Sequence, residues 1–581
     1  MEMITLKING KEYSVPKNST VLEAARYAGI QIPTLCYLKE INEIGACRLC
    51  LVEVKGARGL VTSCVYPVNE GMEIFTNTPK VRAARKLNLE LVLSAHNKKC
   101  LSCVRSTTCE LQKYCNEYGV DEMHFQGTKK EEAAIDDSSV SLIRDNSKCI
   151  LCRRCVAACS NLQGIGAIGM QNRGYDTEVG CENGKLLAQT QCINCGQCVV
   201  ACPVGALYEK DDTDYVFDAI ADESKHVVIT MAPSVRATIG ESFGYAPGTD
   251  VEGKLVAAAK ALGFDAVYDL NFAADLTIME EATELVERLN NGGKLPMITS
   301  CSPGWIKYCE HNFPEMTENL SSCKSPQQMF GAIYKTYYAK KMGYNPEDVV
   351  VISCIPCTAK KFEVKRDDQN AAGVPDVDAA ITTRELASMI SKAGIDFCGL
   401  ADAEYDQPIG IGSGAGAIFG ATGGVMEAAI RTAAEVVANV PFEKVDVASI
   451  RGTEGIKFGE YKLGDITLKV AVTSGTKNAK KLLKMVQNGE VDVQFIEVMA
   501  CPGGCINGGG QPYQPAVVRN NVDLKTLRAS ILYKADAEKL DVRTSHANSA
   551  IKALYDEFLE KPGSHKAHEI LHTTYVKRKL Y

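Results

Sequence analysis

EVMACPGGCINGGGQP, the stretch from Glu497 to Pro512, decides the fold of this chain. It overlaps the end of the mostly apolar run Phe495–Met499, which predicts a buried strand. Cys501 and Cys505 then lie in a glycine-rich turn, where the backbone can bend sharply and approach a bound group closely. Two thiols in such a turn predict a metal site at the end of a strand.

The overall composition is that of a multidomain globular protein. The chain has 581 residues, of which 46% are hydrophobic and 23% charged, and its formal net charge is -7. No block of lysine and arginine is long enough to follow a phosphate backbone, so nucleic-acid binding is not expected. No run approaches the ~20 apolar residues of a membrane span, and the N-terminus MEMITLKING lacks an export signal. We therefore expect a cytoplasmic protein without a membrane span.

Twenty-five cysteines are the most unusual feature of the composition. A secreted disulfide scaffold would be shorter, and an odd number of thiols would leave one unpaired. The cysteines instead form clusters with the spacings of iron–sulfur ligands. Those outside these spacings are expected to be packing residues, with Cys354 close to a motif: Cys115, Cys181, Cys309, Cys323, Cys354 and Cys398.

Residues 1–79 are typical of a plant-type ferredoxin domain with a β-grasp fold. An alternating segment at Thr5–Val15 turns at Asn9-Gly10, and Thr20 then caps a short helix. Zinc is the alternative to iron, because cysteines at the ends of a loop also bind zinc. A long loop before a close cysteine pair favours 2Fe-2S ligation by four residues: Cys36, Cys47, Cys50 and Cys64.

Residues 80–139 are expected to form a small helical module with a histidine-ligated 4Fe-4S cluster. Thr78 and Pro79 open a helix whose core side is predicted to carry six apolar residues: Val81, Ala84, Leu87, Leu91, Val92 and Ala95. An isolated histidine is usually an ordinary packing residue, but the spacing to three cysteines favours a ligand. The pattern resembles a cluster of FeFe-hydrogenases and of respiratory NADH dehydrogenase, and its predicted ligands are His96, Cys100, Cys103 and Cys109.

Residues 140–210 carry a duplicated motif that is typical of bacterial two-cluster ferredoxins. In such modules the fourth cysteine of each run binds the other cluster. One 4Fe-4S cluster would therefore use Cys149, Cys152, Cys155 and Cys202, and the other would use Cys192, Cys195, Cys198 and Cys159. Four clusters in succession predict a route for single electrons between an external partner and a downstream site.

Residues 211–522 change to short apolar runs that alternate with helical patterns, as in an α/β domain. The predicted buried parallel strands are Val227–Met231, Met297–Thr299, Val349–Ser353 and Phe495–Met499. Each run ends close to a polar or thiol side chain: Ser234, Cys301, Cys357 and Cys501. Open α/β sheets bind their ligands at the carboxyl ends of strands, so these side chains are expected to meet in one pocket.

Three motifs together resemble the signature motifs of FeFe-hydrogenases: TSCSPGW at Thr299–Trp305, IPCTAKKFE at Ile355–Glu363, and the opening stretch. The resemblance covers essentially the whole chain and implies a large two-lobed α/β catalytic domain. It implies reversible interconversion of protons, electrons and H2 at an H-cluster, a 4Fe-4S cubane joined to a diiron unit with carbonyl, cyanide and dithiolate ligands. By this resemblance Cys357 and Cys501 bind the cubane, and Cys505 bridges it to the diiron unit.

The resemblance also implies a set of residues that surrounds the diiron unit. Lys360 and Ser234 would face its cyanide ligands, and the cavity would be lined by Met499, Phe419, Pro233 and Gln327. Lys360 has a simpler interpretation as a solvated charge. Its position three residues after Cys357 favours a role beside an anionic cluster.

The first motif departs from the usual TSCC of the family, because Ser302 follows Cys301. In the family the first cysteine relays protons and the second binds the cubane. Either Ser302 fills the metal-ligand position or leaves it open, or Cys301 binds the cubane and the relay changes. The following Pro303-Gly304-Trp305 fixes the register and favours Cys301 as the relay residue.

A helix that we predict to start after Thr277 and to stop at Gly292-Gly293 is a candidate proton route. Glu281, Glu284 and Arg288 share one face of it. A solvated charged stripe is the commoner meaning of such a pattern. The resemblance favours a relay of five residues: Cys301, Glu281, Ser321, Glu284 and Arg288.

The segment 523–581 resembles the separate small subunit of some relatives, here fused to the chain. The implied substrates are protons and H2, and the implied partners are ferredoxin or a flavin-containing, NAD(P)-reactive subunit, with maturation proteins for the diiron unit. Two other functions remain as alternatives: an electron-transfer subunit of an NADH or formate dehydrogenase, and a non-catalytic sensor or assembly relative. The three motifs within residues 297–512 argue against the former, and Glu281, Glu284 and Lys360 argue against the latter.

Overall fold

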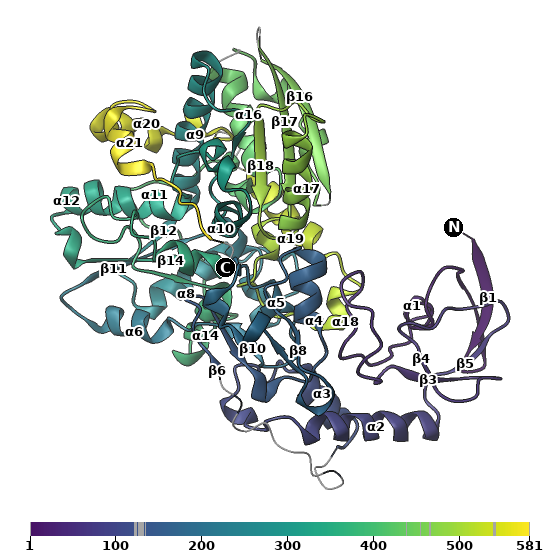
Figure 1. Cartoon of the computed structure of the whole chain (residues 1–581). Helices are drawn as coiled ribbons and strands as arrows, with labels where there is room; N and C mark the ends of the chain where they lie inside the picture. The colour runs from purple at the N-terminus through teal and green to yellow at the C-terminus, as the bar shows by residue number, and fades with distance from the viewer. Residues whose placement is uncertain are drawn as a thin grey trace.

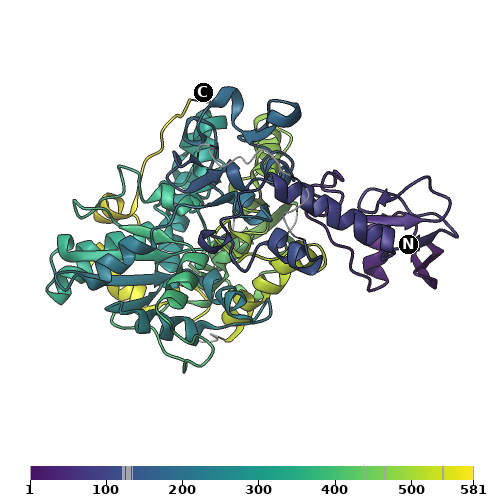
Figure 2. The same cartoon turned by 90° about the horizontal axis from the view of Figure 1, so that it is seen from below.

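The computed structural model describes residues 2–579, apart from 121–124, 126–132, 134, 437–438, 454, 464–465 and 539–541. In Figure 1 the N-terminal module, drawn in purple, projects from the rest of the protein, and Figure 2 shows the same projection from below. Helix α2 (Pro79–Ser94) joins this module to the remainder of the chain.

The N-terminal module is a five-stranded mixed sheet with one helix, as expected for a β-grasp. Strands β1 (Met3–Ile8) and β2 (Lys11–Pro16) form the predicted hairpin, in which Asn9 and Gly10 both have positive φ. Helix α1 (Val21–Tyr27) begins with the predicted cap, since the Thr20 hydroxyl accepts a hydrogen bond from the Glu23 backbone N–H. The sheet order is β2-β1-β5-β3-β4, with β3 (Leu51–Val54), β4 (Val61–Thr62) and β5 (Glu73–Phe75).

Helix α2 starts where predicted and buries Val81 as expected, but two leucines expected on the core side are exposed. Thr78 caps the helix, and Val81, Arg85 and Leu89 are buried, whereas Leu87 and Leu91 are both 47% exposed. The prediction that Leu87 and Leu91 face a core is therefore wrong. The buried face includes the long side chain of Arg85, whose guanidinium donates to the Leu51 carbonyl oxygen at 2.8 Å. The small module ends with α3 (Glu110–Glu117).

The next module is built around a three-stranded sheet and two short helices that carry cysteines. The sheet order is β10-β7-β6, with β6 (Ile135–Asp136), β7 (Leu142–Asp145) and β10 (Leu207–Glu209). Helices α4 (Arg154–Ala157) and α5 (Gln197–Ala201) pack together, and a hairpin is formed by β8 (Gly169–Gln171) and β9 (Glu178–Gly180). Arg154 is buried and pairs with Glu110 of α3 at 2.7 Å, which fastens this module to the preceding one.

The large domain contains two separate four-stranded sheets. The first has the order β12-β11-β14-β15 and is entirely parallel, with β11 (His226–Met231), β12 (Ala266–Asp269), β14 (Val349–Cys354) and β15 (Ala379–Ile381). The second has the order β13-β18-β17-β16, with β13 (Met297–Ile298), β16 (Ile456–Leu463), β17 (Ile466–Ser474) and β18 (Phe495–Met499), and only β16 is antiparallel. In Figure 1 the first sheet lies on the left and the second on the right. All four predicted strands are confirmed, two in each sheet.

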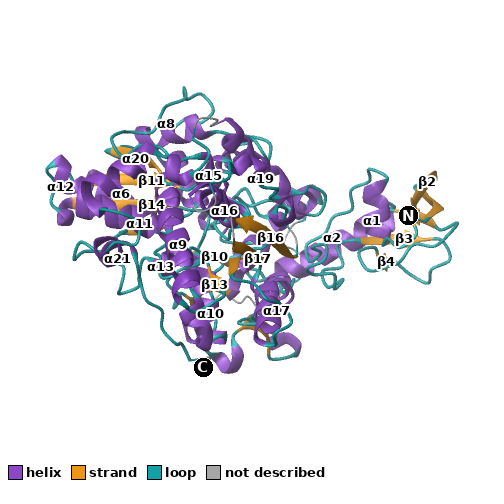
Figure 3. Cartoon of the chain, turned by 90° about the horizontal axis from the view of Figure 1, so that it is seen from above, coloured by secondary structure: helices purple, strands orange, loops and turns teal. Residues whose placement is uncertain are grey.

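Helices cover both sheets, as Figure 3 shows with helices in purple and strands in orange. Before the second motif they are α6 (Thr213–Ala221), α7 (Pro233–Arg236), α8 (Glu252–Leu262), α9 (Asn271–Asn291), α10 (Pro303–Asn312), α11 (Pro326–Ile333) and α12 (Ala339–Met342). After it come α13 (Ala359–Glu363), α14 (Thr383–Lys392), α15 (Gly414–Ala417), α16 (Gly424–Val436) and α17 (Thr476–Gln487).

The predicted start of α9 is wrong. The helix begins at Asn271, and the hydroxyl of Thr277 lies inside it, donating to the Ala273 carbonyl oxygen at 2.8 Å. The carboxylate of Asp269 instead accepts a hydrogen bond from the first helical N–H, that of Asn271, at 3.0 Å. The predicted stop is confirmed, because Gly292 adopts the left-handed conformation that ends the helix.

The C-terminal segment wraps around the large domain, in yellow in Figure 1. Its helices are α18 (Ala516–Arg519), α19 (Leu524–Glu538), α20 (Ser549–Leu554) and α21 (His565–Leu571). After α21 the chain runs along the segment before α11, where the Thr573 N–H donates to the Ser322 carbonyl oxygen at 2.8 Å. Among the described residues, no helix is both long and apolar enough to span a membrane.

Candidate active site

The carboxyl ends of β11, β13, β14 and β18 meet around one cavity. This is the edge at which parallel sheets bind their ligands. Most of the side chains predicted to surround the active site line this cavity: Pro233, Ser234, Cys301, Ser302, Gln327, Cys357, Lys360, Phe419, Met499 and Cys505. Cys501 is not part of the lining, but it is buried. Its thiol lies close enough to those of Cys357 and Cys505 for them to raise its pKa.

The three thiols of the second and third motifs form a donor set that suits an iron–sulfur cluster. Burial raises the pKa of Cys505 to about 12 and raises the pKa of Cys357 and of Cys501 as well. One of these thiols is buried and two are partly buried, and they become thiolates only when a cation such as iron compensates their charge. The hydroxyl of Ser234 and Oε1 of Gln327 are also buried without a hydrogen-bond partner among the described residues. The site therefore offers three thiols that can bind iron, together with a hydroxyl and an amide oxygen that have no partner among the described residues. This donor set fits the H-cluster.

Glycine is required where the third motif crosses its neighbours. A Cβ atom on Gly508 would lie 1.9 Å from the carbonyl oxygen of Pro356, and one on Gly509 would lie 2.2 Å from the carbonyl oxygen of Cys195. Side chains at these positions would separate the third motif from the second and from the two-cluster module. The glycine-rich sequence thus brings Cys501 and Cys505 close to both.

The two residues of the first motif face different surroundings. Ser302 lies towards the third motif, where its hydroxyl accepts a hydrogen bond from the Ala500 backbone N–H at 3.2 Å. Cys301 lies beside Glu281, and burial together with that carboxylate raises the pKa of its thiol well above the ordinary value. The structure therefore brings Ser302 towards the predicted cubane ligands and Cys301 towards the predicted relay.

The predicted relay residues lie between the cavity and the surface, and hydrogen bonds join the outer three of them. Glu281 is fully buried, and its carboxylate oxygens have no hydrogen-bond partner among the described residues. Burial and the nearby Glu284 raise the pKa of Glu281 to about 8. The Ser321 hydroxyl donates to Oε2 of Glu284 at 2.8 Å, and Arg288 binds Oε1 at 2.6 Å. The side chains of Glu284 and Arg288 are 11% and 15% exposed, so this end of the chain reaches the surface.

Lys360 is buried and held in place by hydrogen bonds, which excludes its interpretation as a solvated charge. Its ammonium lies 3.1 Å from the carbonyl oxygen of Cys301 and 2.9 Å from Oε2 of Glu363. The same carboxylate oxygen accepts hydrogen bonds from the Ser325 hydroxyl at 2.7 Å and the Gln327 amide at 2.6 Å. Glu363 thus positions both Lys360 and Gln327. Sequence reasoning missed it, although its place three residues after Lys360 is a spacing that allows pairing on a helix.

The duplicated motif forms two small cavities with the interleaved cysteine sets that were predicted. One cavity is lined by Cys149, Cys152, Cys155 and Cys202. The other is lined by Cys159, Cys192, Cys195 and Cys198. The second cavity adjoins the large domain, since the Thr358 hydroxyl donates to the Asn194 carbonyl oxygen at 2.6 Å. The Cys357 thiol lies close enough to the thiols of Cys195 and Cys501 to raise the pKa of both.

The four thiols of the first N-terminal ligand set lie together, and the second set stays a prediction in which two of the three cysteines are close to each other. The Cys47 backbone N–H donates to the Cys36 sulfur at 3.5 Å, and the thiols of Cys36, Cys47, Cys50 and Cys64 perturb one another's pKa values. In the next module the thiol of Cys103 is near Cys109, and Nδ1 of His96 is buried without a hydrogen-bond partner among the described residues. Burial lowers the pKa of His96 to about 4, so its imidazole is neutral and able to bind a metal. Cys100 begins the short helical turn Cys100–Ser102 in this module.

The cysteines outside the motifs have different environments. Cys181, Cys309, Cys323 and Cys354 are buried, as expected of packing residues, and Cys115 is partly buried. Cys398 is exposed, so the expectation that it packs in a core is wrong. It lies just after the buried Phe397, where the chain turns outward.

Comparison with known proteins gives consistent matches along the chain. A family model described as "Iron only hydrogenase large subunit, C-terminal domain" matches residues 225–509. A 2Fe-2S cluster binding domain matches residues 1–79, the iron–sulfur binding region of NADH-ubiquinone oxidoreductase G matches 85–124, and a 4Fe-4S dicluster domain matches 148–206. A model described as "Iron hydrogenase small subunit" matches residues 522–578.

Relatives match the whole length of the chain. It is 48% identical to the "NADP-reducing hydrogenase subunit HndD" of Solidesulfovibrio fructosivorans, covering 100% of both chains. It is 45% identical to "Iron hydrogenase 1" of Clostridium pasteurianum, covering 99% of this chain and 100% of the relative. A solved structure of apo [FeFe]-hydrogenase HydA1 from Chlamydomonas reinhardtii is 40% identical over 63% of this chain and 99% of its own, with a TM-score of 0.57.

Proposed function

This chain belongs to the FeFe-hydrogenase family, and from that premise we propose which of its residues carry out the reversible conversion of protons and electrons to H2. The observation that carries the proposal is the cavity at the strand ends, where residues from all three motifs meet. When bound, the H-cluster supplies the diiron unit at which protons are reduced. The protein holds this group, delivers protons and electrons, and keeps bulk water away.

Cys357, Cys501 and Cys505 are the proposed cysteine ligands of the H-cluster. Cys357 and Cys501 would hold the cubane, and Cys505 would hold both the cubane and the diiron unit. Ser302 would take the fourth cubane position, because its hydroxyl faces the third motif and Cys301 lies near Glu281 of the relay. The hydrogen bond of Ser302 with the Ala500 N–H supports this assignment, since Ala500 is the residue before Cys501.

The remaining cavity residues hold the non-protein ligands by contact and polarity. Lys360 and Ser234 supply a cation and a hydroxyl donor for the cyanide groups, and the free Oε1 of Gln327 adds an acceptor. Pro233, Phe419 and Met499 supply apolar walls. The Glu363 carboxylate holds the Lys360 side chain in place, so this cation does not need to rearrange during turnover.

Protons travel along Cys301, Glu281, Ser321, Glu284 and Arg288. The raised pKa of Glu281 suits this work, because a carboxyl that titrates near the working pH can both accept and donate a proton. The Ser321 hydroxyl donates to the outer carboxylate, Glu284, and lies near enough to Glu281 to lower its pKa, which supports a position between the two carboxylates. Arg288 holds Glu284 at the outer end of the route.

Four accessory clusters would supply the electron route, in proposed domains at residues 1–79, 80–139 and 140–210 before the catalytic domain 211–522 and the fused segment 523–581. The first two domains would hold the 2Fe-2S and histidine-ligated clusters on the side of the electron partner. The cysteine set of Cys149 would hold the next cluster, and the set of Cys192 would hold the cluster beside the catalytic domain. The contact of Asn194 with Thr358 supports the last step, because it joins the second ferredoxin cavity to the second motif.

The proposed electron partners are a ferredoxin or a flavin-containing, NAD(P)-reactive subunit. The name of the relative from Solidesulfovibrio fructosivorans, an NADP-reducing hydrogenase subunit, supports the latter. Maturation proteins that insert the diiron unit are further partners, and a cytoplasmic location remains a prediction. Purification from the native host would distinguish the two partners. Co-purification of a flavoprotein and an NAD(P)H-dependent activity would support the flavin-containing subunit, and neither is expected for a ferredoxin-only enzyme.

Infrared spectroscopy of the matured protein tests the active site itself. Bands of metal-bound carbonyl and cyanide are expected, and their absence from a correctly matured sample would end the H-cluster assignment. Ser234→Ala should shift the cyanide bands because it removes a donor from the cavity. Ser353→Ala is the matched control, since Ser353 is equally buried and lacks a hydrogen-bond partner for its hydroxyl among the described residues, yet does not line the cavity.

A further inference from the structure

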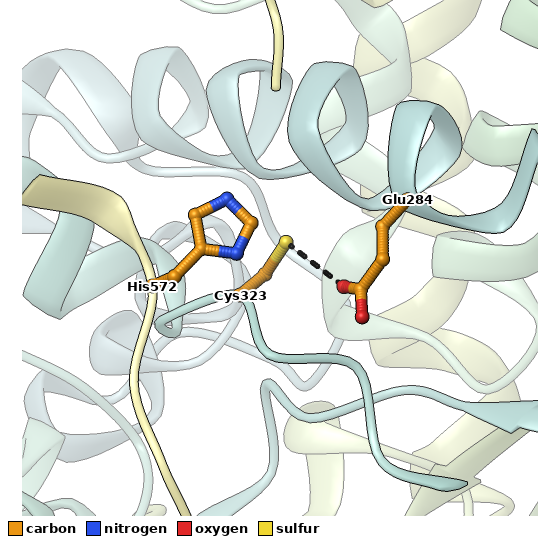
Figure 4. A group of neighbouring side chains, drawn as sticks. All are labelled: Glu284, Cys323 and His572. Carbon is orange, nitrogen blue, oxygen red and sulfur yellow. Dashed lines mark hydrogen bonds between the residues drawn. The ribbon is translucent and has the colours of Figure 1, made fainter. Parts of the chain in front are cut away.

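Three potential metal ligands from distant parts of the chain meet at the outer end of the proposed proton route. Glu284 comes from α9, Cys323 from the segment before α11, and His572 from the segment after α21 (Figure 4). Their donor atoms all lie within 4.8 Å of one another, and Oε2 of Glu284 is 3.8 Å from the Cys323 sulfur. In Figure 4 the carboxylate and one ring nitrogen both face that sulfur.

Thiolate, imidazole and carboxylate together are the ligands that proteins use for Zn²⁺. Donor atoms around a tetrahedral zinc are about 3.3–3.7 Å apart, given the usual zinc–sulfur and zinc–nitrogen distances. The separation between Glu284 and Cys323 is already close to this range. Small side-chain rotations would bring His572 into it, and the fourth position would be left to water.

His572 is oriented in the way that is usual for metal-binding histidines. Its Nε2 lies 3.1 Å from Oε2 of Glu280, and this carboxylate also accepts a hydrogen bond from the Gly563 backbone N–H at 3.0 Å. A carboxylate on one ring nitrogen fixes the ring and leaves the other nitrogen for a metal. That other nitrogen, Nδ1, is paired with the rotatable hydroxyl of Ser322 at 2.8 Å.

The charges around the cluster favour a cation. Glu280, Glu281 and Glu284 all act on the Cys323 thiol, and with burial they raise its pKa well above the ordinary value. The one cation in contact with Glu284 among the described residues is Arg288, which binds Oε1 and leaves Oε2 towards the thiol. The adjacent Lys324 is paired with Asp376 at 2.7 Å.

The cluster is close to the surface. The exposed His568 stacks on His572 with ring centroids 3.9 Å apart, and the side chains of His572 and Glu284 are 6% and 11% exposed. A dissolved ion therefore reaches these ligands without crossing the core.

We propose that Glu284, Cys323 and His572 form an inhibitory Zn²⁺ site that closes the proton route when it is occupied. The regulatory part rests on the proposed role of Glu284 in proton transfer. A zinc-bound carboxylate can no longer exchange protons with Ser321 or with solvent. Binding replaces the Cys323 proton, which is released to solvent, and no electrons are exchanged.

The test uses the matured holoenzyme and zinc sulfate, with H2 evolution and zinc K-edge X-ray absorption as independent readouts. We expect zinc to inhibit reversibly, with recovery on addition of EDTA, and to show one sulfur among nitrogen and oxygen neighbours. In Cys323→Ala and His572→Gln the half-inhibiting zinc concentration should rise by about tenfold or more. Cys398→Ser is the matched control, because it removes the exposed thiol that would bind zinc adventitiously.

Each outcome decides one part of the proposal. Sulfur-free zinc coordination, or equal inhibition of the wild type and both cluster variants, would overturn the site. Zinc bound through Cys323 without slower turnover would keep the site and overturn its regulatory role. That last outcome would place the fault in the relay assignment of Glu284, which Glu284→Gln tests separately by its turnover in the absence of zinc.

Discussion

The hydroxyl of Ser302 accepts a hydrogen bond from the backbone N–H of Ala500 at 3.2 Å, which fixes the first motif against the third. Because Ala500 precedes Cys501, this contact orients Ser302 towards the proposed cubane ligands. The thiol of the adjacent Cys301 lies close enough to Glu281 for that carboxylate to raise its pKa. The two adjacent residues therefore have different neighbours, which supports the different roles proposed for them.

Substitution of the two residues should therefore have different effects. Cys301→Ala should lower H2 evolution by about 10²–10⁴-fold, the usual contribution of a proton-transfer group, while the cubane iron is retained. Ser302→Cys should keep activity and change the reduction potential of the cubane, because a thiolate replaces an oxygen ligand. Iron analysis and redox titration of the matured variants measure both effects. Loss of cubane iron in Cys301→Ala would instead make Cys301 a ligand.

The pKa of Glu281 predicts opposite pH dependences for the two directions of the reaction. With a pKa raised to about 8, Glu281 is protonated at pH 7 and can donate a proton towards Cys301. Above pH 8 it is mainly a carboxylate, which accepts protons. Hydrogen evolution should therefore fall above pH 8, and hydrogen oxidation should rise over the same interval.

Substitution isolates this group from the rest of the helix. Glu281→Gln should lower both rates by about 10²–10⁴-fold and remove the transition near pH 8 from the residual activity. Glu287→Gln is the control, because Glu287 lies on the same helix but is exposed. A transition that persists unchanged in Glu281→Gln would assign it to another group.

Local spacing predicted the cysteine sets well, because ligands of one cluster are either close in sequence or follow a known interleaved pattern. The two cavities of the duplicated motif contain those sets without exception. Helix ends were less predictable. The side chain of Asp269, two residues before α9, binds the first helical N–H and moves the start away from Thr277.

Contacts between distant segments could not be read from local patterns at all. Glu363 accepts hydrogen bonds from Ser325 and Gln327, although 36 or more residues separate it from either partner. His572 reaches Glu280 across 292 residues of sequence. The position of His572 follows from the packing of the C-terminal segment on α9 and α11, and an isolated histidine carries no sequence signal for it.

The close approach of Gly509 to Cys195 leads us to expect that packing at this contact is needed for electron delivery. A Cβ atom there would lie 2.2 Å from the Cys195 carbonyl oxygen, so Gly509→Ala must displace the ferredoxin loop or the third motif. Misplacement of this kind should lower H2 evolution from an external electron donor by about 10- to 100-fold. Isotope exchange between H2 and deuterated water needs no external electrons and should decline less.

A matched alanine substitution separates this effect from a general effect on folding. Gly59→Ala is the control, because no heavy atom lies within 4 Å of a Cβ built on Gly59. It should leave both rates unchanged. Equal losses of evolution and exchange in Gly509→Ala would mean that the active site itself is distorted, and the electron-delivery interpretation would be abandoned.

Arg384 joins three parts of the protein through one buried guanidinium. It pairs with Glu209 of the two-cluster module through two contacts of 2.7 Å and donates to the Gly509 carbonyl oxygen of the third motif at 2.8 Å. Arg384→Met would leave the buried Glu209 carboxylate unpaired, which should cost about 3–5 kcal/mol of unfolding free energy. Lys260→Met removes the more exposed pair with Asp406 and should cost no more than about 1 kcal/mol. Anaerobic thermal unfolding at one scan rate measures the difference, and equal midpoints for the two variants would show that the Arg384 pair does not stabilise this junction.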